Sequence, residues 1–209
     1  ERICRKYDIL LCADEVICGY GRTGEWFGAQ YFGFTPDIMT TAKGLTSGYI
    51  PMGAVLFNDR IAHVLRDKGG ELAHGYTYSG HPVCAVVALE NIRILQDEKI
   101  VETCKNETGP YLAERIKMLG EHPLVDETRG AGMLGALELV QNKAERKFFA
   151  ERGNVGSLCR NIALKNGLIL RATYDSMLIS PPLIINRSEI DELFEKAWKS
   201  LNETAQAIA

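Results

Sequence analysis

The sequence has no long apolar run, no cluster of basic residues and no closely spaced cysteine pair. Its longest apolar stretches, such as residues 83–89, are far shorter than the roughly 18 residues that a membrane span requires. Lysine and arginine total 24 against 27 aspartate and glutamate residues, which gives a net charge of −3. We therefore expect no membrane span, and neither nucleic acid nor an anionic membrane surface as a partner.

Neither cysteine nor histidine is arranged as a metal site requires. The six cysteines are scattered without a CxxC pair, and the four histidines show no ligand spacing. Cysteines inside apolar segments are typical of reduced, packed side chains in a cytoplasmic protein rather than of a disulfide framework. The sequence therefore predicts a cytoplasmic protein without a metal centre.

The first residues include neither an initiator methionine nor the apolar segment of a signal peptide. They read ERICRKYDILLCADEV, which resembles the end of a helix running into a core strand. We therefore expect these 209 residues to be a fragment whose N-terminal part is missing.

Three apolar runs in the first half of the chain are typical of strands in an α/β sheet. The first is continuous, and it predicts a strand buried on both faces of a parallel sheet. Asn58 or Asp59 can cap a short helix after the third run, and a polar, glycine-rich loop follows at 67–81. Long loops inside compact domains are usually functional. The runs are residues 8–16, 36–42 and 52–58.

The pattern turns helical at Pro82, a residue that suits the first turn of a helix. Apolar residues lie almost all round this helix, which predicts that it is buried. The final helix carries a capping-box signature in Ser188 and Asp191. We expect an α/β fold with two domains, in which residues 1–108 belong to a sheet domain and 109–209 form a smaller α+β domain.

A carboxylate and an amine follow two neighbouring strands: Asp14, with Glu15, ends the first, and Lys43 follows the second. In open α/β sheets, ligands bind outside the carboxyl ends of the strands. A pyridoxal phosphate enzyme needs both groups there. Its lysine forms a Schiff base with the cofactor aldehyde, and a carboxylate keeps the ring nitrogen protonated. A partly apolar pocket around Lys43 would favour the neutral amine that this chemistry requires.

The acidic pair taken alone also fits two structures that bind no pyridoxal phosphate. The simplest is a solvated strand terminus, which accounts for most isolated Asp-Glu pairs. A Walker B strand, which holds Mg²⁺ in nucleotide hydrolases, ends in the same way, although no GxxxxGK[ST] motif occurs in these residues. The combination of Asp14 with Lys43 favours pyridoxal phosphate over both.

The segment LLCADEVICGYGRTGEWFGAQYFGFTPDIMTTAKGLTSGYIPMGAV resembles the signature of the class III aminotransferases, the ω-aminotransferase branch of the fold-type I pyridoxal phosphate enzymes. The likeness continues through HGYTYSGHP, TRGAGMLGALEL and GLILRATYDSMLISPPL, and it covers essentially the whole chain. It corresponds to the C-terminal half of such an enzyme. The resemblance implies part of the large-domain sheet of that fold, then a small domain. It also implies that the missing N-terminal half and a homodimer or higher homo-oligomer complete the site.

Five residues occupy positions that carry functions in that family. Lys43 resembles the lysine that binds the cofactor, and Asp14 resembles the partner of the pyridine nitrogen. Val16, two residues along the expected strand from Asp14, resembles the residue that packs on the ring. Thr77 resembles the hydroxyl that binds the cofactor phosphate of the neighbouring subunit. Arg171 resembles the arginine that binds the carboxylate of a keto acid.

One departure from the wider family bears on the substrates. Many glutamate-using members carry glutamine directly after DEV, where this chain has Ile17. The resemblance therefore implies a transaminase that moves an amino group from a primary amine, a putrescine-like diamine or an ω-amino acid to pyruvate, giving alanine. Arg22 and Arg129 are expected to be mainly structural.

Four alternatives remain open at this point. One is a class III enzyme that uses glutamate and 2-oxoglutarate, and another is an aminomutase or decarboxylase of the same family. A P-loop nucleotide hydrolase belongs to a different enzyme class. The last is an inactive half that serves only as a structural partner.

Overall fold

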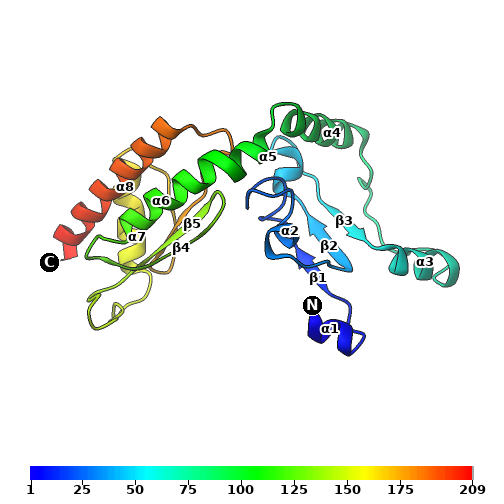
Figure 1. Ribbon diagram of the computed structural model, residues 1–209, viewed down its shortest axis with the longest axis horizontal. Helices are drawn as coiled ribbons and strands as arrows, with labels where there is room; N and C mark the ends of the chain where they lie inside the picture. The colour runs from blue at the N-terminus through cyan, green and yellow to red at the C-terminus, as the bar shows by residue number, and fades with distance from the viewer. Residues whose placement is uncertain (209) are drawn as a thin grey trace. The chain divides into compact units, whose positions relative to one another are not determined.

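The computed structural model describes residues 1–208, which fold into two compact units (Figure 1). The first unit is Glu1–Glu102, and the second begins at Thr103. The sequence placed the boundary after residue 108. The observed boundary lies six residues before the predicted one. Cys104 is already buried in the second unit, where its thiol lies 3.3 Å from the carbonyl oxygen of Leu183.

The first unit contains a three-stranded mixed sheet with the order β1-β2-β3. Strands β1 and β2 are parallel, and β2 and β3 are antiparallel. A 3₁₀ turn, η1, follows β2 directly. The elements are α1 (Arg2–Lys6), β1 (Cys12–Asp14), α2 (Gly28–Phe32), β2 (Ile38–Thr41), η1 (Lys43–Thr46), β3 (Ala54–Phe57), α3 (Asp59–Lys68) and α4 (Pro82–Asp97).

The second and third predicted strands are confirmed as β2 and β3, but the first prediction is only partly right. Strand β1 covers three residues of the expected run 8–16, and only its middle residue, Ala13, is buried. Ile9 and Leu10, which precede it, are exposed. Within residues 1–208, β1 is the edge strand of its sheet and is hydrogen-bonded to β2 alone, and the described residues do not cover both of its faces.

Asp37 is buried and forms hydrogen bonds with residues near three other elements, α1, β1 and α3. It accepts hydrogen bonds from the Leu11 backbone N–H at 2.8 Å, from Arg5 at 2.8 Å and from the Asn58 side chain at 2.9 Å. The Leu11 N–H, followed by Arg5 and Asn58, lowers the pKa of Asp37. Asn58 also caps α3 by accepting from the Ile61 N–H at 3.2 Å, which confirms the predicted cap.

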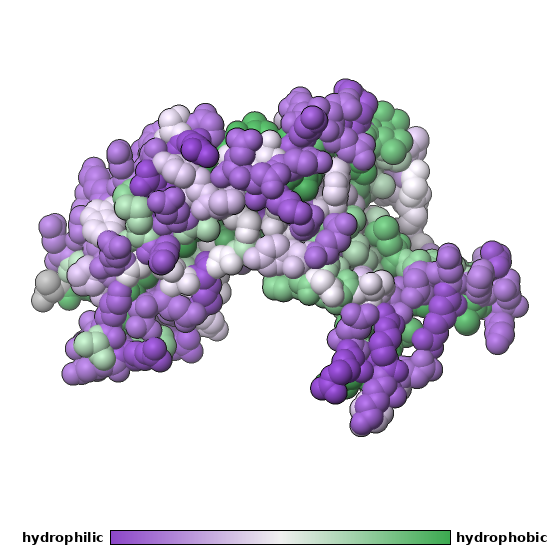
Figure 2. All heavy atoms as spheres, viewed as in Figure 1, coloured by the Kyte–Doolittle hydropathy of each residue, from purple (hydrophilic) through white to green (hydrophobic). Residues whose placement is uncertain are grey.

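Pro82 lies in the first turn of α4, as the sequence predicted. The helix itself is less buried than expected, since Ala88 and Leu95 are its only buried residues in the described chain. Exposed apolar side chains on α4 and on β3 form part of the hydrophobic surface in Figure 2. A helix that packs on one side only leaves its remaining apolar residues in solvent, so the prediction of a fully buried helix was wrong.

The second unit is an antiparallel sheet packed with helices, and its order is β4-β5-β7-β6. Helices α6 and α7 pack on the sheet and against α8, and the core between them contains Leu137, Met177 and Ile190. The short helix α5 (Ile100–Thr103) spans the boundary between the units. The elements that follow it are the π-helical segment η2 (Cys104–Thr108), α6 (Gly109–Leu119), β4 (Val125–Ala131), β5 (Leu134–Leu139), α7 (Asn154–Lys165), β6 (Arg171–Thr173), β7 (Ser176–Ile179) and α8 (Arg187–Ile208). The two units together confirm the predicted α/β class.

The start of α8 differs from the predicted capping box. Asn186 and Glu189 form it, because the Glu189 N–H donates to Asn186 Oδ1 at 3.0 Å and the Asn186 N–H donates to Glu189 Oε2 at 2.9 Å. Ser188 donates to Asn186 instead, and Asp191 accepts from Tyr111 on α6. The cap therefore lies two residues earlier than the Ser188–Asp191 pair.

Candidate active site

Asp14 and Lys43 lie at the same edge of the first sheet. Asp14 is the last residue of β1, and its register partner on the parallel strand β2 is Thr40. Lys43 follows Thr40 by three residues and is the first residue of η1. Strands β1 and β2 run side by side in Figure 1, so the acid after β1 and the amine after β2 follow neighbouring strand ends.

The carboxylate of Asp14 is held in a defined orientation. Its Oδ1 accepts the Val16 backbone N–H at 3.0 Å and the Thr40 hydroxyl at 3.3 Å. In the part of the chain that the structure describes, Oδ2 has no hydrogen-bond partner, and the residue is exposed. One oxygen is thus fixed by protein donors while the other is open to a ligand.

Val16 was expected on the same strand as Asp14, but it lies in the turn after β1, since the strand ends at Asp14. Its backbone contacts Asp14 directly through the N–H hydrogen bond. The side chain is half-buried. The expected alternation along a continuous strand was therefore wrong at this position.

Glu15 has a different task from its neighbour Asp14. It is 3% exposed, and its two carboxylate oxygens accept the backbone N–H groups of Gly28 at 2.7 Å and Ala29 at 2.6 Å. These are the first residues of α2, so Glu15 satisfies donors that a helix N-terminus leaves without partners. Glu15 thereby holds the start of α2 against the end of β1, a contact that the sequence pattern did not predict.

Lys43 begins a turn with an unusual backbone. Its φ of +40° lies in the left-handed region, which residues other than glycine rarely adopt. The sequence predicted a partly apolar pocket around it, but the Lys43 side chain is exposed and no hydrogen bond of its ammonium group occurs within residues 1–208. The strand end places the lysine as expected, whereas residues 1–208 do not enclose it.

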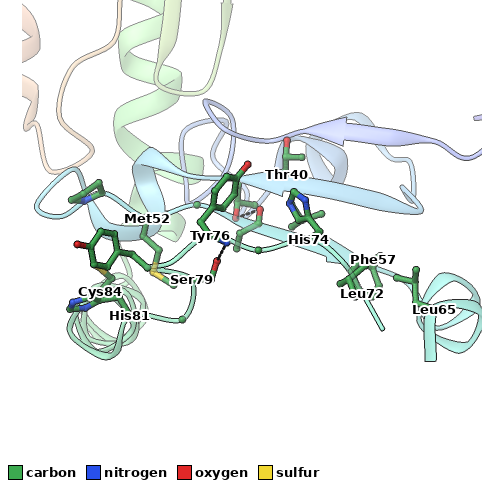
Figure 3. A pocket seen from close by; sticks show the side chains of 18 residues that line it. Thr40, Met52, Phe57, Leu65, Leu72, His74, Tyr76, Ser79, His81 and Cys84 are labelled. Atoms are coloured by element: carbon green, nitrogen blue, oxygen red, sulfur yellow. Dashed lines mark hydrogen bonds between the residues drawn. The ribbon is translucent and has the colours of Figure 1, made fainter. Parts of the chain in front are cut away.

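A cleft of about 820 Å³ lies between β3 and the loop that follows α3 (Figure 3). Thr40 and Met52 line it from one side, and His74 and Tyr76 from the loop line it on the other. Thr77 follows Tyr76 in this loop and is exposed, as is every residue of the expected segment 67–81. Tyr76 is 77% exposed, so its ring borders the cleft while most of its surface remains in contact with solvent.

Arg171 belongs to the second unit, where it is the first residue of the edge strand β6. It is exposed, and it pairs in register with Leu178 of β7. The structure records neither a hydrogen bond nor an ion pair for its guanidinium among residues 1–208. The charged group is thus available to an anion.

The β6–β7 hairpin that carries Arg171 is anchored at its turn. Asp175 is buried there and accepts the N–H groups of Gly153 at 2.8 Å and Gly156 at 2.9 Å, at the start of α7. A Cβ on Gly156 would lie 2.0 Å from the carbonyl oxygen of Tyr174, so only glycine fits. This close approach fixes the hairpin against α7.

Arg129 has the kind of contacts expected of a structural residue. It forms ion pairs with Glu127 at 3.2 Å on its own strand, β4, and with Glu138 at 3.1 Å on the neighbouring strand, β5.

Between residues 1 and 208 we find no group of three or more histidine, cysteine, aspartate or glutamate side chains placed to hold a metal ion. Over the same residues, no helix is both long and apolar enough to cross a lipid bilayer.

The residues present fit pyridoxal phosphate. An oriented carboxylate suits a protonated pyridine nitrogen, and a primary amine on the adjacent strand end suits an aldehyde. The solved structures that resemble the chain share this architecture. An omega transaminase from Pseudomonas jessenii in complex with PMP superposes with a TM-score of 0.94 at 42% identity, covering 98% of this chain and 46% of the other. The fold is that of the fold-type I pyridoxal phosphate enzymes.

The aminotransferase class-III family matches residues 1–201, and the chain belongs to this family. It is 62% identical over 208 residues to the putrescine–pyruvate aminotransferase of Pseudomonas aeruginosa, covering 100% of this chain and 45% of that protein. It is 40% identical over 214 residues to the diaminobutyrate–2-oxoglutarate transaminase of Halomonas elongata, again with 100% and 45% coverage.

The chain spans about half the length of the curated relatives that it matches. Class III aminotransferases are pyridoxal phosphate enzymes, so the family assignment confirms the cofactor class inferred from the sequence. The same assignment gives no support to a P-loop nucleotide hydrolase.

Proposed function

We propose that the protein carrying this chain is a pyridoxal phosphate-dependent aminotransferase that uses pyruvate as amino acceptor and produces alanine. Its donor is a primary amine, a putrescine-like diamine or an ω-amino acid. The observation that carries this proposal is that Asp14 ends β1 in register with Thr40 of the parallel strand β2, and that Lys43 follows the end of β2. The 62% identity to a putrescine–pyruvate aminotransferase supports the choice of donor and acceptor.

Four residues of the first unit hold the cofactor in this proposal. Lys43 binds it covalently, Asp14 pairs with its ring nitrogen through the open Oδ2, and Val16 packs on the ring. The Thr77 hydroxyl binds the cofactor phosphate of a neighbouring subunit, which agrees with its place on an exposed loop. When bound, pyridoxal phosphate supplies an electron sink for the bond broken at the substrate carbon.

Lys43 and Arg171 also act on the substrates. Once the amine donor has taken its place on the cofactor aldehyde, the freed ε-amino group of Lys43 would remove a proton from the substrate carbon as a base and then return a proton as an acid. The guanidinium of Arg171 binds the carboxylate of pyruvate through two parallel N–H donors. An amine donor without a carboxylate does not need that contact.

The two units correspond, in this proposal, to the C-terminal part of the large cofactor-binding domain and to the small C-terminal domain. A further N-terminal half and a second copy of the protein complete the site, in a homodimer or a higher homo-oligomer. Large apolar side chains on β3 and α4, such as Phe57 and Leu89, are exposed in the described chain and suit such contacts. The proposed location is the cytoplasm, where cysteines remain reduced.

A glutamate-using aminotransferase is the nearest second candidate, because one relative is a diaminobutyrate–2-oxoglutarate transaminase. Ile17 argues against it: its apolar side chain can donate no hydrogen bond to the cofactor. An aminomutase or decarboxylase of the family needs no keto acid as acceptor. Assays with pyruvate and 2-oxoglutarate separate all three.

The experiment uses the full-length protein with pyridoxal phosphate and a panel of amines. We expect alanine from pyruvate with at least one diamine or ω-amino acid, and a much slower reaction with 2-oxoglutarate. Borohydride reduction and peptide mass spectrometry are expected to place the cofactor on Lys43. Lys43→Ala is expected to abolish the adduct, whereas the exposed control Lys68→Ala retains it. Cofactor bound elsewhere, or no alanine with any amine, contradicts the proposal.

A further inference from the structure

Asn91, on α4, directs its whole side-chain amide at the turn that begins with Lys43. Its Nδ2 donates hydrogen bonds to the carbonyl oxygens of Gly44 at 2.8 Å and Leu45 at 3.1 Å. Its Oδ1 accepts the hydroxyl of Ser47 at 2.6 Å. Three contacts from one side chain to a single short turn are more than helix packing requires, since packing alone could be provided by an apolar residue.

The turn needs such restraint because its backbone is strained at both ends. Lys43 has a φ of +40° and Ser47 a φ of +48°, and neither is glycine. Residues with a Cβ pay a steric penalty in the left-handed region and remain there only where the surroundings hold them. Asn91 bonds directly to Ser47 and to the two carbonyls that lie between the strained positions.

Close packing at Gly44 also restrains the turn. A Cβ built on Gly44 would lie 3.1 Å from Tyr20 Cβ and 3.2 Å from the carbonyl oxygen of Gly19. Tyr20 is itself fixed, since its hydroxyl lies 3.3 Å from Thr41 Oγ1 at the end of β2. The turn is therefore held both by close packing against Gly19 and Tyr20 and by the hydrogen bonds of Asn91.

We infer that Asn91 is a positioning residue that sets the direction in which Lys43 presents its amino group to the cofactor aldehyde, an inference that rests on the proposed function. A lysine side chain has several rotatable bonds, so its reach depends on where its Cα–Cβ bond points. That direction follows from the backbone angles of Lys43, which the contacts of Asn91 maintain. Reacting groups must be held within a fraction of an ångström and a few tens of degrees for efficient bond formation.

The amide of asparagine is the group that this position requires. It combines two N–H donors for two carbonyl oxygens with one acceptor for a hydroxyl. Aspartate retains the acceptor for Ser47 but places a negative charge against the two carbonyls. Alanine removes all three contacts, and Ser47→Ala removes one. These variants form a graded series of loss.

The test uses the full-length protein without cofactor, to which pyridoxal phosphate is added. The rate of attachment to Lys43 is followed by borohydride trapping and peptide mass spectrometry, and the pH midpoint of the visible absorbance of the lysine-bound cofactor is recorded. We expect Asn91→Ala and Asn91→Asp to slow attachment by about tenfold or more and to shift the midpoint. The control is Gln96→Ala, an exposed position on the same helix, which is expected to match the wild type within about twofold.

Each outcome of this test is informative. If wild-type Lys43 is labelled and both folded Asn91 variants react at the wild-type rate with an unchanged midpoint, the inference is wrong while the proposed function stands. If wild-type Lys43 is not labelled at all, the proposed function fails, and the inference fails with it. If the Asn91 variants do not fold, Ser47→Ala decides, because slower attachment in that variant supports the inference and a wild-type rate overturns it.

Discussion

The Thr40 hydroxyl donates a hydrogen bond to Oδ1 of Asp14 across the paired ends of β2 and β1, at an oxygen–oxygen distance of 3.3 Å. The Val16 N–H donates to the same oxygen at 3.0 Å. Both donors engage one oxygen only, so the carboxylate has a fixed orientation with Oδ2 open to a ligand. This arrangement suits the role that we propose for Asp14, that of a specific partner for a cationic ring nitrogen.

We expect Asp14→Asn to bind pyridoxal phosphate but to lose most of its turnover, with kcat lower by about 100-fold or more. A neutral amide cannot stabilise the positive charge of a protonated ring nitrogen. Steady-state kinetics with a reactive amine and pyruvate measure the effect. Thr40→Val is the matched control, because it removes one hydrogen bond to Asp14 and is expected to cost less than about tenfold in kcat. Near-normal turnover in Asp14→Asn would contradict the assigned role.

Glu15→Gln is expected to destabilise the first unit without removing any group that contacts the cofactor. Glu15 is buried and accepts two backbone N–H groups, at 2.7 and 2.6 Å, whereas a glutamine would direct its own NH₂ group at one of them. An unsatisfied buried donor costs about 1–3 kcal/mol. Urea unfolding of the full-length protein measures the loss. The exposed control Glu71→Gln is expected to leave the unfolding midpoint unchanged, and an equal midpoint for Glu15→Gln would show that the cap contributes nothing.

The shared location of Asp14 and Lys43 could be predicted from the sequence because it depends on residue type and order. An acid and a lysine that follow neighbouring parallel strands of an α/β sheet lie at the same end of that sheet, as the register of Asp14 with Thr40 shows for the strand ends. The extent of burial could not be predicted in the same way. An apolar run shows what a segment is able to bury, but β1 and α4 are exposed where the described chain supplies no neighbour.

The supporting contacts could not be predicted for a different reason. Glu15 meets Gly28, and Asn91 meets Gly44, across 13 and 47 positions of the chain. Neither contact leaves a periodic pattern, and both residues occur in segments whose polar positions suggest a solvated surface. The predicted capping box of α8 was wrong for a more local reason. Asn186 and Ser188 are both good N-cap residues, and only the backbone geometry distinguishes them.

We expect the protein to lose stability in mild acid because of the environment of His122. Burial lowers its pKa, and the charge of Lys143 contributes in the same direction. Its Nδ1 accepts the Leu124 N–H at 3.1 Å, so the proton of the neutral ring lies on Nε2, which faces Asn202 Oδ1 at 3.1 Å. Because the folded state binds a proton less readily than the unfolded state, stability falls as the pH drops through the unfolded-state pKa near 6.5.

We therefore expect the unfolding midpoint of the full-length protein to decrease between pH 8 and about pH 5.5, in the window set by the unperturbed histidine. His122→Gln removes the titrating group, so its midpoint is expected to depend less on pH over this range, although the variant is less stable at every pH. The control is His63→Gln, which replaces an exposed histidine on α3. Its unfolding midpoint is expected to depend on pH as strongly as that of the wild type. A slope that is unchanged in His122→Gln would assign the effect to other groups.

Arg171→Ala is expected to separate the two halves of the reaction. The guanidinium is exposed on β6 without a partner in the described residues, and binding a carboxylate through two charge-assisted hydrogen bonds contributes about 1.5–3 kcal/mol. KM for pyruvate is therefore expected to rise by about 10- to 100-fold, while the rate of the single-turnover reaction with a simple monoamine changes by less than about threefold.

Two further variants test the reason for this effect. Arg171→Lys retains the charge but not the planar pair of donors, so its effect on KM for pyruvate is expected to be intermediate. Arg160→Ala, an exposed arginine on α7, is the control for the loss of one positive charge. Equal losses for pyruvate and for the monoamine would mean that Arg171 supports the fold of the hairpin and does not recognise the carboxylate.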